Sequence, residues 1–314
     1  MSDTSLAALL LTNRLVEVAA KPFSSGEYWA LLSKVPDPSV LLDADLPTVI
    51  RLLCGTGSGA ADSCETDALR VVRLLAAATA FAFARERLEE EGISLLSSFD
   101  ERFPGRLRDR LDAACPPFLT VAGPIEWLSS GGLGVVGSRA AHPEALAVAR
   151  SAAGLAARAG RVVVSGLARG IDQESMAGAL DAGGPVVGIP SEGLRLAGRS
   201  PEVRRRVHSG ELCIASPYGP DARFSAGNAL GRNKIIFGLA DVTFVVCADD
   251  GSGGTWGGSS EALRRGFGPV NVWMGAGQGA GNASLARLGG RAITEVAHAV
   301  LEVATPVQPH DATS

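Results

Sequence analysis

The stretch VVSGLARGID (residues 163–172) reads as the end of a buried strand followed at once by a turn. The apolar run stops at Ser165, and a new apolar pattern begins near Asp172, which we expect to cap the next helix. A hydrophobic strand that passes through a glycine-rich turn into a helix is typical of α/β proteins with a parallel sheet. Ligands of such sheets bind beyond the carboxyl ends of the strands, where this turn must lie.

The same alternation of strand and helix extends on both sides of this stretch. The predicted strands are Leu133–Val136, Arg161–Ser165, Pro185–Ile189, Glu211–Ala215, Val242–Cys247 and Pro269–Trp273. The predicted helices are Pro143–Ala159, Gln173–Ala182, Pro201–Ser209, Ala226–Leu239 and Ser260–Phe267. This order predicts an α/β fold with a Rossmann-like, doubly wound and mostly parallel sheet that helices cover on both faces.

The region before residue 91 has apolar residues at helical spacing instead. The helices expected there are Ser5–Ala20, Gly26–Ser33, Pro47–Leu53 and Thr66–Glu91, with a loop at residues 55–63. Short strands at 93–99 and 117–123 then flank a short helix at 104–111, and a last helix is expected at about Ala292–Ala304. We therefore predict a smaller N-terminal helical domain (1–90), a Rossmann-like domain (91–304) and a flexible tail (305–314).

Composition excludes several classes of protein. The 314 residues are 46% hydrophobic and carry a net charge of −4, which fits neither a disordered chain nor a generally basic one. The five cysteines form no CxxC pair and the four histidines belong to no ligand cluster, so we expect no disulfide framework and no metal site. The start has no signal-peptide pattern, and the apolar stretch Leu74–Ala84 is too short to cross a bilayer. These features predict a cytoplasmic protein without a membrane partner.

Two neighbouring strand ends carry groups that suit an anion. In VVGSRA (135–140), Gly137 permits a tight turn, while Ser138 and Arg139 supply donors. The turn after the next strand repeats this pattern with the residues Ser165, Gly166, Arg169 and Gly170. The two turns together predict an anion-binding groove along the sheet edge. GLGVVG (132–137) matches a dinucleotide fingerprint only literally, because the strand lies inside the pattern.

Two later motifs point to the same edge. GRNKIIFGLAD (231–241) places a polar triplet, Arg232, Asn233 and Lys234, at what we take for a helix start. DDGSGGTWGGSSEAL (249–263) reads as a glycine-rich loop in which the backbone of Gly253, Gly254 and Thr255 can approach a phosphate. It is not a phosphate loop of nucleotide triphosphatases, because Ser259 stands where the lysine is needed. The arginines of 104–111 and of 204–206 are expected on solvated helix faces.

In this order the motifs resemble those of the DNA-processing protein A (DprA/Smf) family. The resemblance rests on EEEGISLLSSFDERFPGRLRD (89–109), PPFLTVAG (116–123), GVVGSRA (134–140), VVSGLARGIDQESMAGAL (163–180) and GNALGRNKIIFGLAD (227–241). It implies an extended Rossmann-like domain behind a SAM-like helical domain. It also implies a cytoplasmic homodimer without a cofactor that binds single-stranded DNA and loads the RecA recombinase in natural transformation. Departures from the family pattern include Ser175 and Met176 in place of an Ala-His pair, and Cys247 in place of an acid.

A second function remains open. GGTWGGSSEAL (253–263) is similar to the GG-x-x-G-T-x-x-E motif of the wider superfamily, which includes LOG-type phosphoribohydrolases. Glu261 matches the glutamate of that motif, while Gly258 stands at the threonine position. The resemblance therefore also allows a small-nucleotide sensor, or a hydrolase that uses Glu261 as its catalytic carboxylate. The DNA-binding protein would have no catalytic residue.

Overall fold

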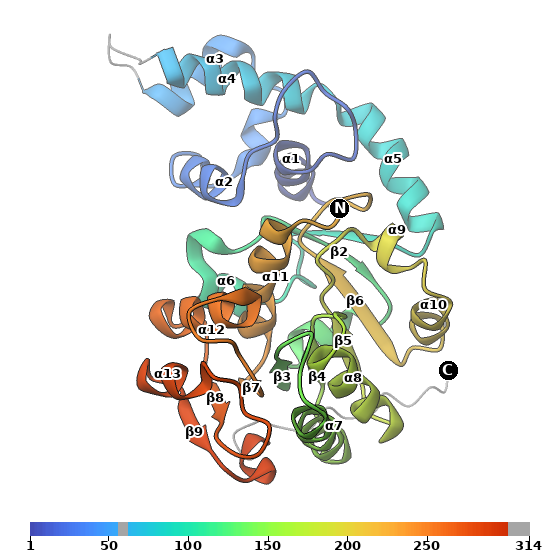
Figure 1. Cartoon of the computed structure of the whole chain (residues 1–314). Helices are drawn as coiled ribbons and strands as arrows, with labels where there is room; N and C mark the ends of the chain where they lie inside the picture. Colours follow the sequence, from blue (N-terminus) through green and yellow to red (C-terminus); the bar gives the residue numbers. More distant parts are fainter. Residues whose placement is uncertain (56–61, 301–314) are drawn as a thin grey trace. The chain divides into compact units, whose positions relative to one another are not determined.

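The computed structural model describes residues 1–55 and 62–300, and Figure 1 shows its helices and strands. Two compact units share the chain. The first contains residues 1–103, 112–121 and 217–220, and the second contains residues 104–111, 122–216 and the chain from 221 onward. The division into domains at residue 90 stays a prediction. Most of the loop expected at 55–63, and the tail at 305–314, lie outside the described residues.

The first unit consists of helices and one antiparallel strand pair. Its α-helices are α1 (Asp3–Thr12), α2 (Ser25–Leu32), α3 (Leu46–Cys54), α4 (Asp62–Leu75) and α5 (Ala78–Glu90). Its strands are β1 (Ser94–Ser97) and β2 (Phe118–Ala122), with short 3-10 helices at Pro38–Leu41 and Asp112–Ala114. Ser24 begins α2 with a complete capping box, because its side chain accepts from Glu27 N and the Glu27 carboxylate accepts from Ser24 N. Tyr28 and Phe81 are among the largest fully buried side chains of the core.

Two helix boundaries in this unit differ from the prediction. The first helix ends at Thr12 instead of Ala20, because Asn13 Oδ1 accepts from Leu15 N at 2.8 Å and so turns the backbone out of the helix. The helix expected over Thr66–Glu91 is divided into α4 and α5 by a turn at residues 76–77. That turn falls within a run of alanines, so the sequence contains no glycine or proline to indicate it.

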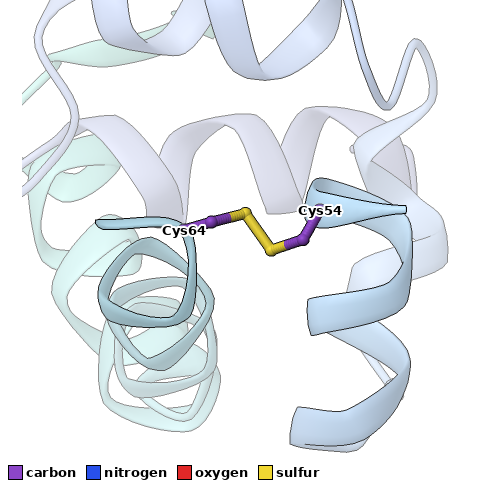
Figure 2. The surroundings of a disulfide bond; sticks show 2 residues. All are labelled: Cys54 and Cys64. Carbon is purple, nitrogen blue, oxygen red and sulfur yellow. A yellow bond between two sulfur atoms is a disulfide. The ribbon is translucent and has the colours of Figure 1, made fainter. Parts of the chain in front are cut away.

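The expectation of no disulfide is wrong. Cys54 at the end of α3 is bonded to Cys64 in α4, with the two Cα atoms 6.0 Å apart (Figure 2). The two cysteines are 10 positions apart in the sequence, so no CxxC spacing indicates the bond. The other three cysteines form no disulfide and are buried, as expected of inert thiols for Cys213 and Cys247. Burial raises the pKa of both the Cys213 and the Cys247 thiol.

The second unit contains a parallel sheet with the strand order β6-β5-β4-β3-β7-β8-β9. Its strands are β3 (Leu133–Val136), β4 (Val163–Ser165), β5 (Val186–Gly188), β6 (Leu212–Ser216), β7 (Val242–Val245), β8 (Val270–Trp273) and β9 (Arg291–Ile293). Its α-helices are α6 (Gly105–Leu111), α7 (Pro143–Arg158), α8 (Ile171–Asp181), α9 (Leu194–Ala197), α10 (Pro201–His208), α11 (Ala226–Leu239), α12 (Gly253–Arg265) and α13 (Asn282–Arg287). Short 3-10 helices lie at Ile125–Ser129 and Val296–Ala299.

This sheet confirms the predicted doubly wound fold. The strand order reverses between β3 and β7, which are neighbours although most of the domain lies between them in sequence. Helices α7 and α8 pack on each other and on β3 and β4, while α11 packs on β7 and on α12 (Figure 1). Because parallel crossovers are right-handed, this reversal puts helices on both faces and opens a crevice at the carboxyl ends of β3 and β7.

Three expectations in the second unit are corrected. The helix expected at Ala292–Ala304 is not formed up to residue 300: β9 pairs with β8, and within the described residues 292–300 only 296–299 form a helical turn. The glycine-rich stretch 253–259 is the first half of α12, and a Cβ at Gly258 would lie 2.9 Å from Asn233 in α11, so this glycine allows two helices to approach. Arg106 pairs with Asp241, and Arg110 donates to the carbonyl oxygens of residues 237 and 240, so neither arginine lies on a solvated face.

Candidate functional site

A cavity of about 360 Å³ opens at the crevice between β3 and β7. Its walls come from the turn after β3, the first half of α11 and the first turn of α12. The residues that line it are Val136, Gly137, Ser138, Arg139, Ala140, Ala168, Asp172, Phe224, Ala226, Ala229, Leu230, Arg232, Asn233, Asp249, Ser252, Gly253, Gly254 and Thr255. Eight of the predicted site residues are therefore brought together: Gly137, Ser138, Arg139, Arg232, Asn233, Gly253, Gly254 and Thr255.

The turn after β3 presents an exposed cation. Ser138 N donates to Cys247 O at 3.0 Å, which joins this turn to the end of β7, and Ser138 Oγ accepts from Ala140 N at 3.2 Å. The Arg139 side chain is exposed, and its guanidinium carbon lies 5.4 Å from the centre of the Phe224 ring. Phe224 is itself 54% exposed. The guanidinium is thus available to an anion that enters the cavity.

The turn after β4 packs against the turn after β3 and contributes only Ala168 to the cavity wall. Gly170 has φ +80°, and a Cβ there would lie 2.5 Å from Ser138 O, so the two turns fit closely together. Ser165 is fully buried, and its hydroxyl donates to Val135 O at 2.7 Å, which links β4 to β3. Gly166 likewise does not line the cavity. Arg169 is exposed but lines a different depression, so the two turns do not form one continuous groove.

An ion pair is buried at the base of the cavity. Arg232 and Asp172 are 3% and 6% exposed, and Nη1 of the arginine lies 3.5 Å from Oδ2 of the aspartate. Burial raises the pKa of Asp172, and the charge of Arg232 opposes that rise. Nε and Nη1 of Arg232 have no hydrogen-bond partner among the described residues. Asp172 does not cap α8, whose N-cap is Gly170, because its side chain faces Arg232 instead.

The wall formed by α11 and α12 contributes backbone amides. Asn233 Nδ2 donates to Gly254 O at 2.8 Å, which ties the first turn of α12 to α11. The first N–H groups of a helix have no partner within it, and the N-cap residue Ser252 makes no side-chain capping bond. The amides of the first turn therefore face the cavity uncapped, at the positive end of the helix dipole. The predicted polar triplet lies in the middle of α11 and not at its start, because the helix begins at Ala226.

Two further candidate residues, on α11 and α12, also lie outside the cavity. Lys234 follows Asn233 on α11 but is half-buried outside the cavity wall. Glu261 is in the second half of α12 and not at its start, and its carboxylate pairs with Arg265 one turn later at 3.3 Å. Glu261 is not part of the wall, so its carboxylate does not reach a molecule bound there; the carboxylate of the 249–263 stretch that lines the cavity is that of Asp249.

Sequence reasoning missed four kinds of lining group. Phe224 and Leu230 are 54% and 44% exposed and give the entrance an apolar side, but no periodic pattern marks them. Asp249 and Ser252 lie in the stretch read as a loop, where only its glycines drew attention. Two arginines and two aspartates line the cavity, so its charges nearly balance. The attraction for a phosphate must come from the exposed Arg139 and the uncapped amides.

No helix within residues 1–55 and 62–300 is long and apolar enough to cross a membrane. The same residues contain no cluster of three or more His, Cys, Asp or Glu side chains that could hold a metal ion.

Comparison with known proteins points to one family. The family model for DNA recombination-mediator protein A matches residues 94–303. The chain is 29% identical over 166 residues to DNA processing protein DprA of Bacillus subtilis, a match that covers 52% of this chain and 55% of the relative. It is 32% identical over 161 residues to DprA of Streptococcus pneumoniae, covering 50% and 55%. The matches thus span about half the length of these relatives.

Solved structures of related proteins have the same fold. The X-ray structure of DprA from Streptococcus pneumoniae superposes with a TM-score of 0.65 at 22% identity, covering 90% of this chain and 99% of that one. The Helicobacter pylori DNA processing protein A, studied for its single-stranded DNA binding mode, gives a TM-score of 0.53 at 22% identity, covering 66% and 93%. At these identities the likeness establishes the fold.

Proposed function

The chain belongs to the DNA recombination-mediator protein A family, and from that premise we propose that it binds single-stranded DNA at the cavity between β3 and β7. One observation carries the proposal. Arg139 is exposed at the entrance of the cavity, and the uncapped first turn of α12 lines the same cavity. A cation and a set of backbone amides around one concave space suit a backbone phosphate, which needs donors on several sides.

The structure of the cavity favours a single strand over a duplex. Its volume of about 360 Å³ is at the lower end of the range for small-molecule sites, roughly 300–1,000 Å³, and leaves room for about one nucleotide. Phe224 and Leu230 give one side an apolar surface, which a paired base inside a duplex could not reach. Proteins that hold single strands commonly combine phosphate contacts with such surfaces.

The wider role follows from the family. We propose that the chain delivers bound single-stranded DNA to the RecA recombinase during natural transformation, and that it works as a homodimer in the cytoplasm. Arg169 and Lys234 lie outside the cavity, so any contact they make with DNA would be with the strand before or after the bound nucleotide. No catalytic step belongs to this role.

Fluorescence anisotropy with labelled oligo-dT at two salt concentrations tests the proposal. Arg139→Ala is expected to weaken binding roughly tenfold at low salt and to lower the salt slope by about 0.7, since one phosphate contact is removed. Arg204→Ala is the matched control, because Arg204 is an exposed arginine on α10 outside the cavity. Binding that does not depend on salt, or equal losses in both variants, would refute the assignment.

The size of the cavity also favours a second candidate, the recognition of a free mononucleotide. Titration with nucleoside monophosphates, with oligo-dT as the competitor, separates the two functions. Tight binding of the monophosphate that oligo-dT fails to displace would favour a small-nucleotide sensor. Release of free base that Glu261→Gln abolishes would establish a phosphoribohydrolase, although the ion pair of Glu261 with Arg265 outside the cavity gives that reaction no support.

A further inference from the structure

A second depression on the second unit has an apolar floor. We call it the α8–α10 groove; its volume is about 580 Å³, and residues of α7, α8, α9, α10 and the turn after β4 line it. The floor is made of four half-buried side chains: Leu167, Leu180, Leu196 and Val203. A group of apolar side chains that share one open groove is a common mark of a site where another molecule binds.

The backbone is adapted to keep one of these side chains in place. Leu167 has φ +56°, in the left-handed region that a bulky residue rarely adopts. A Cβ at Gly188, at the end of β5, would lie 2.7 Å from Leu167 Cδ1, so this strand must end in glycine to admit the leucine. Strained residues of this kind persist where the surrounding structure holds them, and they cluster at binding sites.

The charges around the floor are matched in some places and unmatched in others. Arg150 pairs with Glu174 and Asp181, and Arg206 pairs with Glu202 and Glu211. Arg169 is exposed and has no ion-pair or hydrogen-bond partner for its guanidinium within residues 1–55 and 62–300. The Glu192 carboxylate accepts from Ser191 Oγ at 3.1 Å; it is attracted to the buried Arg232 but forms no close ion pair within the same residues. An unpaired guanidinium and a carboxylate outside any close ion pair therefore border the apolar floor.

We propose that the α8–α10 groove docks a short amphipathic helix of a partner protein. The helix would place apolar side chains on the floor, a carboxylate against Arg169 and a basic side chain against Glu192. A nucleic acid strand is a poor match, because its phosphates would meet Glu192 and leave the floor uncovered. A fatty acid would match Arg169 and the floor but leave Glu192 unpaired. This inference does not depend on the DNA site, since the groove and the cavity share no lining residue.

The test is a selection of peptides on the full chain. A phage library of random 16-residue peptides is panned against the protein and counter-selected against the Leu180→Glu/Leu196→Glu variant. We expect recovered peptides with apolar residues at helical spacing between an acid and a base. The single variants Leu180→Glu and Leu196→Glu should each weaken peptide binding at least about tenfold, because each puts a charge on the apolar floor. Both single variants should bind oligo-dT like the parent protein, which would show that they are folded.

A charge exchange then tests the orientation. Arg169→Glu should weaken a recovered peptide, and changing the acid of that peptide to lysine should restore its binding. Failure to recover any peptide that discriminates between parent and variant overturns the proposal, as does binding that neither floor variant weakens. A peptide whose affinity is unchanged by Arg169→Glu refutes the assigned charge contact. None of these results bears on whether the cavity binds single-stranded DNA.

Discussion

Replacing Gly166 with alanine should destabilise the second unit severely. A Cβ on this residue would overlap Nη1 of Arg232 and Oδ2 of Asp172, so the buried ion pair would have to separate or move. Overpacking a buried site costs typically 1–3 kcal/mol, and uncoupling a buried charge pair costs about 3–5 kcal/mol. Because the pair can shift partly without breaking, we expect a loss of about 2–4 kcal/mol in the free energy of unfolding.

Urea-induced unfolding followed by circular dichroism measures this loss. Gly254→Ala is the matched control, since its Cβ would find only the Asn233 amide at 3.8 Å. That variant should match or slightly exceed the parent in stability, because alanine is the better helix former. The cost of Gly166→Ala should fall by at least half when Arg232→Met and Asp172→Leu have already removed the ion pair. A Gly166→Ala protein as stable as the parent, or an undiminished cost in that background, would refute the explanation.

Three further predictions concern other contacts. Reduction of the Cys54–Cys64 disulfide by dithiothreitol should lower the unfolding free energy of the first unit by about 2–3 kcal/mol, because the bond closes a loop with a sequence separation of 10. In thermal melts, dithiothreitol should have no effect on the Cys54→Ser/Cys64→Ser variant. The hydrogen bond from Arg70 lowers the pKa of Glu27 from 4.5 to about 2, so the stability it adds is complete above pH 4.5 and is lost as the pH falls towards 2. As Glu27 is partly exposed, that contribution is at most about 1 kcal/mol, and Glu27→Gln should abolish its part of the pH dependence in acid titrations. Asn233→Ala should cost about 1 kcal/mol and should accelerate hydrogen exchange of residues 253–257, because the bond to Gly254 O is lost; unchanged exchange there would contradict this role of Asn233.

The sequence was most informative where local chemistry decides the structure. Helix α10 begins after Ser200 with Pro201 and stops before Gly210, as its capping residues indicate, and Ser200 Oγ accepts from Val203 N. Strands β3 to β8 are buried on both faces, so each reads as an apolar run, whereas β9 is exposed at Arg291 and Ala292 and has no such run. The order of these runs and the helices between them were enough to predict the doubly wound topology.

What sequence reasoning missed depends on contacts between distant residues. Arg106 lies on a helix in which arginines alternate with other residues. Its partner Asp241 is far away in the sequence, so no residue near Arg106 in the sequence indicates that its side chain is half-buried. The glycines of α12 were read as loop residues, whereas Gly258 is required by the approach of Asn233. Asp172 was expected to cap a helix, and only the fold reveals that Arg232 lies beside it.

The same limit applies to the site. The turns after β3 and β4 were predicted to form one groove because both contain serine, glycine and arginine. In the structure the second turn packs behind the first, which directs Arg139 into the cavity and Arg169 away from it. Phe224 belongs to an irregular connection before α11, where sequence has no period to identify it.

The close fit of these two turns constrains how the protein can vary. Ile171 N donates to Ser138 O at 3.3 Å, and Gly170 leaves no space for a side chain against the same carbonyl. An inserted residue in either turn would displace the other, so lengthening one alone cannot be accommodated. Differences in ligand preference between relatives should therefore arise on the opposite side, in the length of the segment that carries Phe224 and in the first turn of α12, where additions leave these two turns undisturbed.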